Sequence, residues 1–177
     1  MAKSHLEYKK RNYSLETLAR IEETALSNWL RESGLAFFTS LSLHSLGMAF
    51  VVGINIAIGL RLVGFAPQLS IAPLVRFYPL HWYCAAIMFV SGLALLLAYP
   101  AKALTNPVFY AKFAALLIAL GISRKFQQSL AADDLDIEQD VTIKRLAYLS
   151  LALWVITITA GRFLAYTHSI LLASRFY

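Results

Sequence analysis

The sequence predicts an all-α integral membrane protein: a four-helix transmembrane bundle preceded by an amphipathic interfacial helix. Hydrophobic residues make up 59% of its 177 residues and charged residues only 15%, against roughly 25% in soluble domains. A soluble protein this apolar could not cover its core with polar surface, so the excess apolar surface of this chain must face lipid. Four segments reach the length of about 20 mostly apolar residues that a spanning helix needs. An even number of crossings places both termini on one side of the bilayer.

The chain divides into an N-terminal basic segment with its amphipathic helix, residues 1–32, and a transmembrane domain, residues 33–177. The spans are expected at about 35–61, 79–100, 108–123 and 146–167 or longer. The third span is the shortest because Lys112 interrupts its apolar run near the start. The first loop contains three prolines, which favour tight turns over a continuous helix.

Before the first span, the segment from Ser14 to Ser33 is expected to form one amphipathic helix. Apolar residues recur at helical spacing from Leu15 to Trp29, and Ser14 is a suitable N-cap. Such a helix would lie along the interface with Trp29 at headgroup depth. Docking against a partner subunit would use the same apolar stripe.

Charge patterning argues against nucleic acid as a partner, although the formal net charge is +6. The basic residues do not gather on one face or helix, as nucleic-acid binding would require. They lie at the ends of apolar runs, where they reach lipid headgroups. The charges next to the spans are balanced between the two sides. The more distant cluster Lys9, Lys10 and Arg11, and the lack of a removable secretory signal, favour cytoplasmic N- and C-termini.

Helix packing in lipid depends on small residues that let backbones approach closely. Small residues recur at every fourth position in two spans: Ser45, Ala49, Gly53 and Ala57 in the first, and Ala111, Ala115 and Ala119 in the third. We expect the tightest contacts of the bundle at these two faces.

Polar side chains inside a span are costly and mark candidate sites. His44 lies about a third of the way into the first span, and Lys112 and Arg162 fall toward the same side. If the fourth helix continues unbroken past Tyr166, His168 comes within about one turn of His44 in depth. Two imidazoles at matching depth permit a b-type haem with His44 and His168 as axial ligands. Lys112 and Arg162 would then lie near its propionates.

Other interpretations of these side chains stay open. A buried histidine can simply hydrogen-bond a neighbouring helix, and a lysine or arginine near a helix end can extend to the headgroups. His81 lies at the opposite membrane face and cannot join His44. A copper-handling or transport role would use His44, Met48 and the acidic run at residues 133–140. Neither disulfides nor a cysteine-based zinc site can form from the single cysteine, Cys84.

Three stretches carry a resemblance to a known family: SLSLHSLGMAFVVGINIAIGLRLVGF at residues 40–65, NPVFYAKFAALL at 106–117 and LWVITITAGRFLAY at 153–166. They resemble an uncharacterised family of small bacterial four-helix integral membrane proteins, over about residues 25–166. The resemblance implies a bacterial inner (cytoplasmic) membrane and marks four family positions, His44, Arg61, Lys112 and Arg162. It brings no established activity. The sequence departs from the family pattern at Gly59, where an aspartate would be favoured. A looser likeness to CopD-type copper-resistance membrane proteins adds the idea of copper.

Three classes of function therefore remain. The first is a non-enzymatic accessory or scaffold subunit that packs in the lipid bilayer against other membrane subunits or a second copy. The second is a haem-bearing electron carrier, and the third a copper-handling or transport protein. We expect the first, because the other two need sites that the sequence supplies only in part. No nucleophile–base pair, phosphate loop or carboxylate pair lies in a span, so hydrolase or kinase chemistry is not expected.

Overall fold

The computed structural model describes residues 16–65, 67–131 and 140–173, and side chains as far as Leu164 and at Tyr166. The described chain is all-α, as the sequence predicts. Helical turns at residues 16–22 precede seven helices: α2 (Ala25–Glu32), α3 (Gly34–Leu62), α4 (Ala72–Val75), α5 (Tyr78–Ala98), α6 (Pro100–Leu104), α7 (Pro107–Ala131) and α8 (Val141–Ala173).

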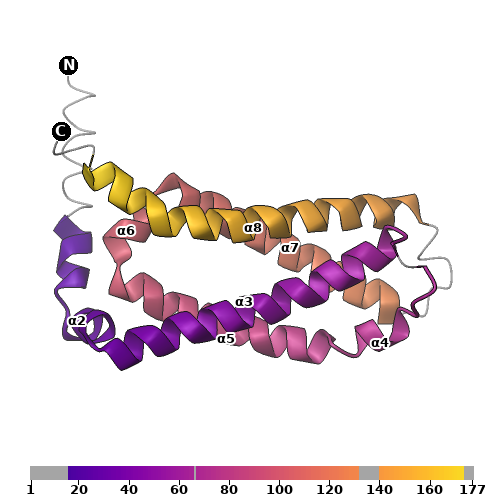
Figure 1. The fold of residues 1–177 in the computed structure, drawn as a ribbon, viewed down its shortest axis with the longest axis horizontal. Coiled ribbons are helices and arrows are strands. Elements are labelled where there is room, and N and C mark those ends of the chain that lie inside the picture. Colours follow the sequence, from indigo (N-terminus) through magenta and orange to yellow (C-terminus); the bar gives the residue numbers. More distant parts are fainter. Residues whose placement is uncertain (1–15, 66, 132–139, 174–177) are drawn as a thin grey trace, which may run out of the picture.

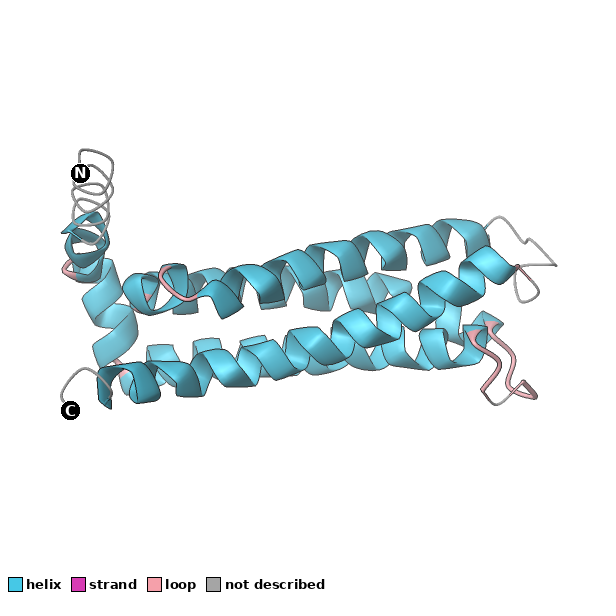
Figure 2. Ribbon diagram, turned by 90° about the horizontal axis from the view of Figure 1, so that it is seen from above, coloured by secondary structure: helices cyan, strands magenta, loops and turns pink. Residues whose placement is uncertain are grey.

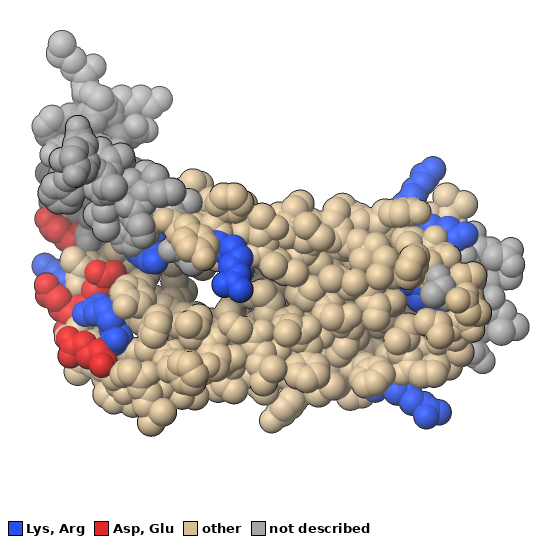
Figure 3. All heavy atoms as spheres, viewed as in Figure 1, with Lys and Arg blue, Asp and Glu red and all other residues tan. Residues whose placement is uncertain are grey.

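Four stretches are long and apolar enough to cross a membrane: Gly34–Leu62, Ala72–Ala98, Pro107–Ala131 and Val141–Leu164. The long helices lie side by side with alternating direction, so the described chain begins and ends at the same end of the bundle (Figure 1). Charged side chains gather mainly at the two ends and leave most of the body between them uncharged (Figure 3). Large apolar side chains such as Phe89, Val90 and Val155 are exposed on that body. The prediction of a four-helix membrane protein in contact with lipid is confirmed.

The third long helix extends beyond the apolar run that predicted it. The run ends near Ile122, but α7 continues to Ala131. Phe126 is 1% exposed and packs with Leu130 in the core, although the neighbouring Arg124 is exposed. Packing of one face thus maintains the helix where mean hydropathy has already fallen, which a simple count of apolar residues does not detect.

The N-terminal segment forms short helices where the sequence suggested one. Thr24 accepts a hydrogen bond from the backbone N–H of Ser27 (3.3 Å) and so caps α2. Ser33 likewise accepts from the backbone N–H of Ala36 (3.2 Å) and caps α3. Thr24 divides the expected helix and Ser33 ends it, because a capping residue has an extended rather than a helical backbone.

Helix α2 lies across the end of the bundle, at a large angle to the long helices (Figures 1 and 2). Ser27 Oγ donates to the carbonyl oxygen of Leu97 (2.8 Å), and Arg31 Nη1 donates to that of Ala98 (3.3 Å). These two carbonyls belong to the last turn of α5, where no intrahelical donor exists. Docking of α2 therefore completes the C-terminus of α5.

The interior of the bundle is built from two closely packed pairs, α3 with α5 and α7 with α8, and α3 also packs along α8. Two α3 glycines sit at these contacts. A Cβ atom at Gly47 would lie 3.0 Å from the Cys84 carbonyl oxygen and 3.2 Å from the Met88 Cβ; one at Gly59 would lie 3.0 Å from Leu151 Cδ2. The absence of an aspartate at position 59 thus has a packing reason in this chain.

The small-residue stripes expected to make the tightest contacts lie differently. All four residues of the α3 stripe, Ser45, Ala49, Gly53 and Ala57, are exposed, and a Cβ atom at Gly53 would meet nothing within 4 Å. On α7, Ala115 and Ala119 are buried and Ala111 is exposed. Within the chain, α3 therefore makes its close contacts at Gly47, toward α5, and at Gly59, toward α8, and its regular stripe faces outward.

Replacing Gly47 with alanine should lower stability, because the added methyl group forces α3 away from the α5 backbone. Overpacking of this kind costs about 1–3 kcal/mol, partly offset by the higher helix propensity of alanine. Gly53→Ala is the matched control and should be neutral or slightly stabilising. Thermal unfolding in detergent, followed by the reaction of the buried thiol of Cys84 with a fluorogenic maleimide, measures the difference. Equal midpoints for the two variants would contradict the assigned packing face.

Candidate functional site

His44, on α3, is half-buried against α5. Its Nδ1 lies 2.9 Å from the carbonyl oxygen of Met88. A carbonyl oxygen can only accept, so Nδ1 carries the proton and donates it. When the imidazole is neutral, Nε2 is then an acceptor that no described residue engages. This orientation by a backbone carbonyl is the arrangement in which a histidine coordinates metals through Nε2.

The space for this imidazole is made by a glycine. A Cβ atom at Gly92 would lie 2.9 Å from His44 Cε1 and 3.2 Å from Nδ1, a separation that no real side chain would tolerate. Gly92 lies one turn beyond Met88 on α5, so the same helix supplies both the acceptor and the gap. Sequence reasoning missed Gly92 because a glycine inside an apolar run gives no sign of which neighbouring side chain it faces.

Lys112 approaches His44 from α7. Its side chain is half-buried and runs beside Gly161 of α8, whose Cβ position lies 3.5 Å from Nζ. Gly161 continues the buried seam of α8 that includes Trp154 and Thr157 at helical spacing. Lys112 therefore points between the helices rather than away from them, and its charge acts electrostatically on His44. It makes no hydrogen bond or ion pair with any residue that the structure describes.

The structure describes less of the other two residues of the haem hypothesis, Arg162 and His168. Arg162 follows Gly161 directly and is exposed. Helix α8 continues unbroken to Ala173, which meets the condition for His168 to approach His44 in depth. The side chain of His168 lies outside the described residues, so its pairing with His44 stays a prediction.

Figure 3 shows a gap between the upper and the lower helices near the end that carries α2, with Lys or Arg side chains beside it. The contacts of Lys112 with Gly161, and of His44 with Gly92, link α7 to α8 and α3 to α5. These contacts place His44 at the α3–α5 pair and Lys112 at the α7–α8 pair, and the lysine charge acts on the imidazole across the space between the pairs. We call this group, His44, Gly92, Lys112 and Gly161, the His–Lys cleft.

A second buried polar contact lies deeper in the bundle. The Ser123 hydroxyl donates to the Asn55 side-chain oxygen, and Asn55 Nδ2 donates to the Val51 carbonyl (2.7 Å). Asn55 is 2% exposed, so this pair ties α3 to α7 without contact with lipid. The role of Asn55 is to join helices.

His81 lies at the opposite end of the bundle from His44, as expected, but its burial was not foreseen. It is 0% exposed, and neither ring nitrogen has a hydrogen-bond partner among the described residues. The nearby Tyr78 hydroxyl is equally without one. The signal was present in the sequence, because Tyr78, His81, Cys84 and Met88 recur at helical spacing along one face of α5.

Arg61, a position marked by the family resemblance, is 8% exposed, and its Nε donates to the carbonyl oxygen of Leu69 in the following loop. It therefore fastens the loop to the end of α3. Met48 is half-buried beside the core residues Val51 and Cys84. Among the residues described, no three His, Cys, Asp or Glu side chains gather closely enough to hold a metal ion. The acidic run at residues 133–140 lies largely outside the described part of the chain.

No protein-family model matches the sequence, no curated protein matches it, and no solved structure matches the fold. The fold itself defines the class: an integral membrane protein with four candidate spans. Membership of the uncharacterised bacterial family, and the likeness to CopD-type proteins, remain predictions.

Replacing Gly92 with alanine should displace the His44 imidazole and break its bond to the Met88 carbonyl. Interhelical hydrogen bonds in membranes contribute about 0.6 kcal/mol on average. Nitrogen NMR of histidine-labelled protein should show Nδ1 protonated and Nε2 unprotonated at His44 in the original chain, and a changed signal in Gly92→Ala. Gly121→Ala is the control, because a Cβ atom there meets nothing within 4 Å. An unchanged His44 signal in Gly92→Ala would refute this geometry.

Proposed function

We propose that the protein is a non-enzymatic accessory or scaffold subunit that packs in the bilayer against another membrane protein or a second copy of itself. The observation that carries this proposal is the outward-facing small-residue stripe of α3. Close backbone approach at small residues is the main way in which helices associate in lipid. A stripe of this kind that the bundle does not use for its own packing is available to a partner helix.

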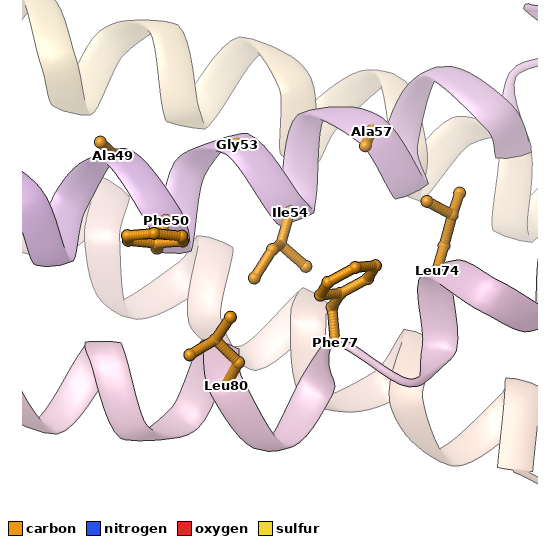
Figure 4. A pocket seen from close by; sticks show the side chains of 8 residues that line it. All are labelled: Ala49, Phe50, Gly53, Ile54, Ala57, Leu74, Phe77 and Leu80. Atoms are coloured by element: carbon orange, nitrogen blue, oxygen red, sulfur yellow. The ribbon is translucent and has the colours of Figure 1, made fainter.

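The shape of the surface supports this proposal. A groove of about 300 Å³ runs beside the stripe between α3 and the start of α5, and Ala49, Gly53 and Ala57 form one side of it. Figure 4 shows Phe77 and Leu80 on the other side and Phe50 next to the stripe on α3, with no polar atom among the labelled side chains. An apolar helix could bury its side chains against these rings while its backbone approaches Gly53.

The N-terminal end offers a second contact region. Helix α2 buries Ser27 and Leu30 against the bundle and leaves Trp29 59% exposed. An exposed tryptophan on a helix across the bundle end fits the headgroup layer, where indole rings are enriched. We place the protein in a bacterial inner membrane with cytoplasmic termini, supported by the family resemblance and by the basic cluster Lys9, Lys10 and Arg11.

Replacing Gly53 with leucine should break the proposed association while leaving the bundle intact, since no atom of the described residues lies within 4 Å of a Cβ at that position. Mildly solubilised membranes analysed by native gel electrophoresis should show the complex shift toward the monomer. Gly121→Leu is the matched control: it is also exposed, on α7, with no atom within 4 Å of its Cβ position. The proposal fails if the original chain is itself monomeric, or if both variants retain the complex.

A b-type haem is the second candidate, favoured by the orientation of His44. Its Nε2 is left free by the Nδ1 bond to Met88, and Lys112 stands close enough to receive a propionate. His168 would supply the second axial bond, with Arg162 as a further propionate contact.

The haem proposal predicts a Soret band in protein purified from haem-supplemented cells, lost in His44→Ala and retained in His81→Ala. A colourless preparation would eliminate it. Metal analysis of the same preparation tests the copper alternative, in which His44, Met48 and the acidic run would hold the ion; stoichiometric copper, lost in His44→Ala, is the result it requires.

A further inference from the structure

Lys112 carries a positive charge that the proposed helix-docking surface does not use. Lys112 makes no hydrogen bond and no ion pair with a described residue. A cation within a span is costly unless it is paired or reaches water. Since Lys112 points inward along Gly161, lateral extension into the surrounding headgroups does not explain its position. An anion that enters between the helices would give the Lys112 ammonium the partner that the described residues do not supply.

The neighbours of Lys112 suit an anion better than they suit a second cation. His44, oriented by the Met88 carbonyl, carries no negative charge that would neutralise the lysine. Arg162, the residue after Gly161 on α8, is exposed and adds positive charge near the outer side of the His–Lys cleft. The glycines at 92 and 161 make room for the His44 ring and the Lys112 side chain inside the bundle.

The depth of the cleft points to the source of the anion. Lys112 is the sixth residue of α7, which begins at Pro107, so it lies about 8 Å along the helix from that end. This is the level just below the headgroup layer, where the phosphates of the bilayer are the most abundant anions. Basic pockets between transmembrane helices bind anionic lipid headgroups in this way.

The outer surface at the same level can receive an acyl chain. A second apolar groove of about 300 Å³ lies along α8 from Val155 to Phe163 and includes Val108, one turn before Lys112. The only hydroxyl among its lining residues is that of Thr159. Apolar surface and a cation at the same level are what a phospholipid requires.

We propose that the His–Lys cleft binds the phosphate of an anionic phospholipid, with Lys112 as the principal cation and Arg162 at the entrance. The lipid enters between the α3–α5 and α7–α8 pairs at the end that carries α2. His44 faces the same space. Because its Nδ1–H is already donated to the Met88 carbonyl oxygen, the imidazole lines the cleft without donating that hydrogen bond to the phosphate.

The test uses phosphatidylglycerol and phosphatidylcholine as probes, titrated into the purified full-length protein and followed by native mass spectrometry. The original chain should retain phosphatidylglycerol in preference to phosphatidylcholine. Lys112→Met should weaken phosphatidylglycerol binding about 5-fold, the equivalent of about 1 kcal/mol for one basic residue near the headgroups. Lys112→Arg keeps the charge and should bind like the original chain.

Lys125→Met is the matched control, because Lys125 is an exposed lysine at the other end of the same helix. Thermal unfolding of each variant without added lipid separates a folding defect from lost binding. Equal affinity for the two lipids, or Lys112→Met binding like Lys125→Met, would overturn the proposal. So would a haem-containing preparation in which Lys112→Met loses haem but keeps phosphatidylglycerol, since the anion at Lys112 would then be a propionate.

Discussion

The structure depends on the fact that hydrocarbon neither donates nor accepts hydrogen bonds. Each polar group that enters the spans must therefore find its partner inside the protein. His44 meets this constraint through the Met88 carbonyl and Asn55 through Ser123 and Val51. The positions of these bonds determine which face of α3 turns inward, and the apolar residues between them follow. Among the described residues the constraint is left unmet at the charged Lys112 and at several neutral groups, His81, Tyr78, Ser150 and Trp154.

Architecture followed from the sequence because it rests on length and mean hydropathy, which are local properties. Four mostly apolar runs were sufficient to predict four spans, and the lengths of α7 and α8 differed from expectation only at their polar ends. There, buried residues such as Phe126 and Ile143 continue the helical face after the charged residues begin. Helix ends depend on tertiary packing, which hydropathy does not report.

The inward face of α3 was harder to predict, although its signal was present. The small residues Ala49, Gly53 and Ala57 form the more regular pattern, yet spacing alone does not say whether a stripe faces the bundle or the lipid. The polar positions do carry that information, because His44 and Asn55 share one face and each must turn toward a partner. Gly92 could not be assigned, since its contact with His44 exists only once α3 and α5 are packed.

Helix α2 gives the bundle an order of assembly. Its Ser27 hydroxyl and Arg31 guanidinium complete α5 at Leu97 and Ala98, residues that leave the ribosome about 70 positions later. During synthesis, α2 therefore remains undocked until the second span has been inserted. Proteins are made N-terminus first, so the earliest helix of this chain reaches its final contacts only after the α3–α5 hairpin exists. That docking marks the completion of the first half of the fold.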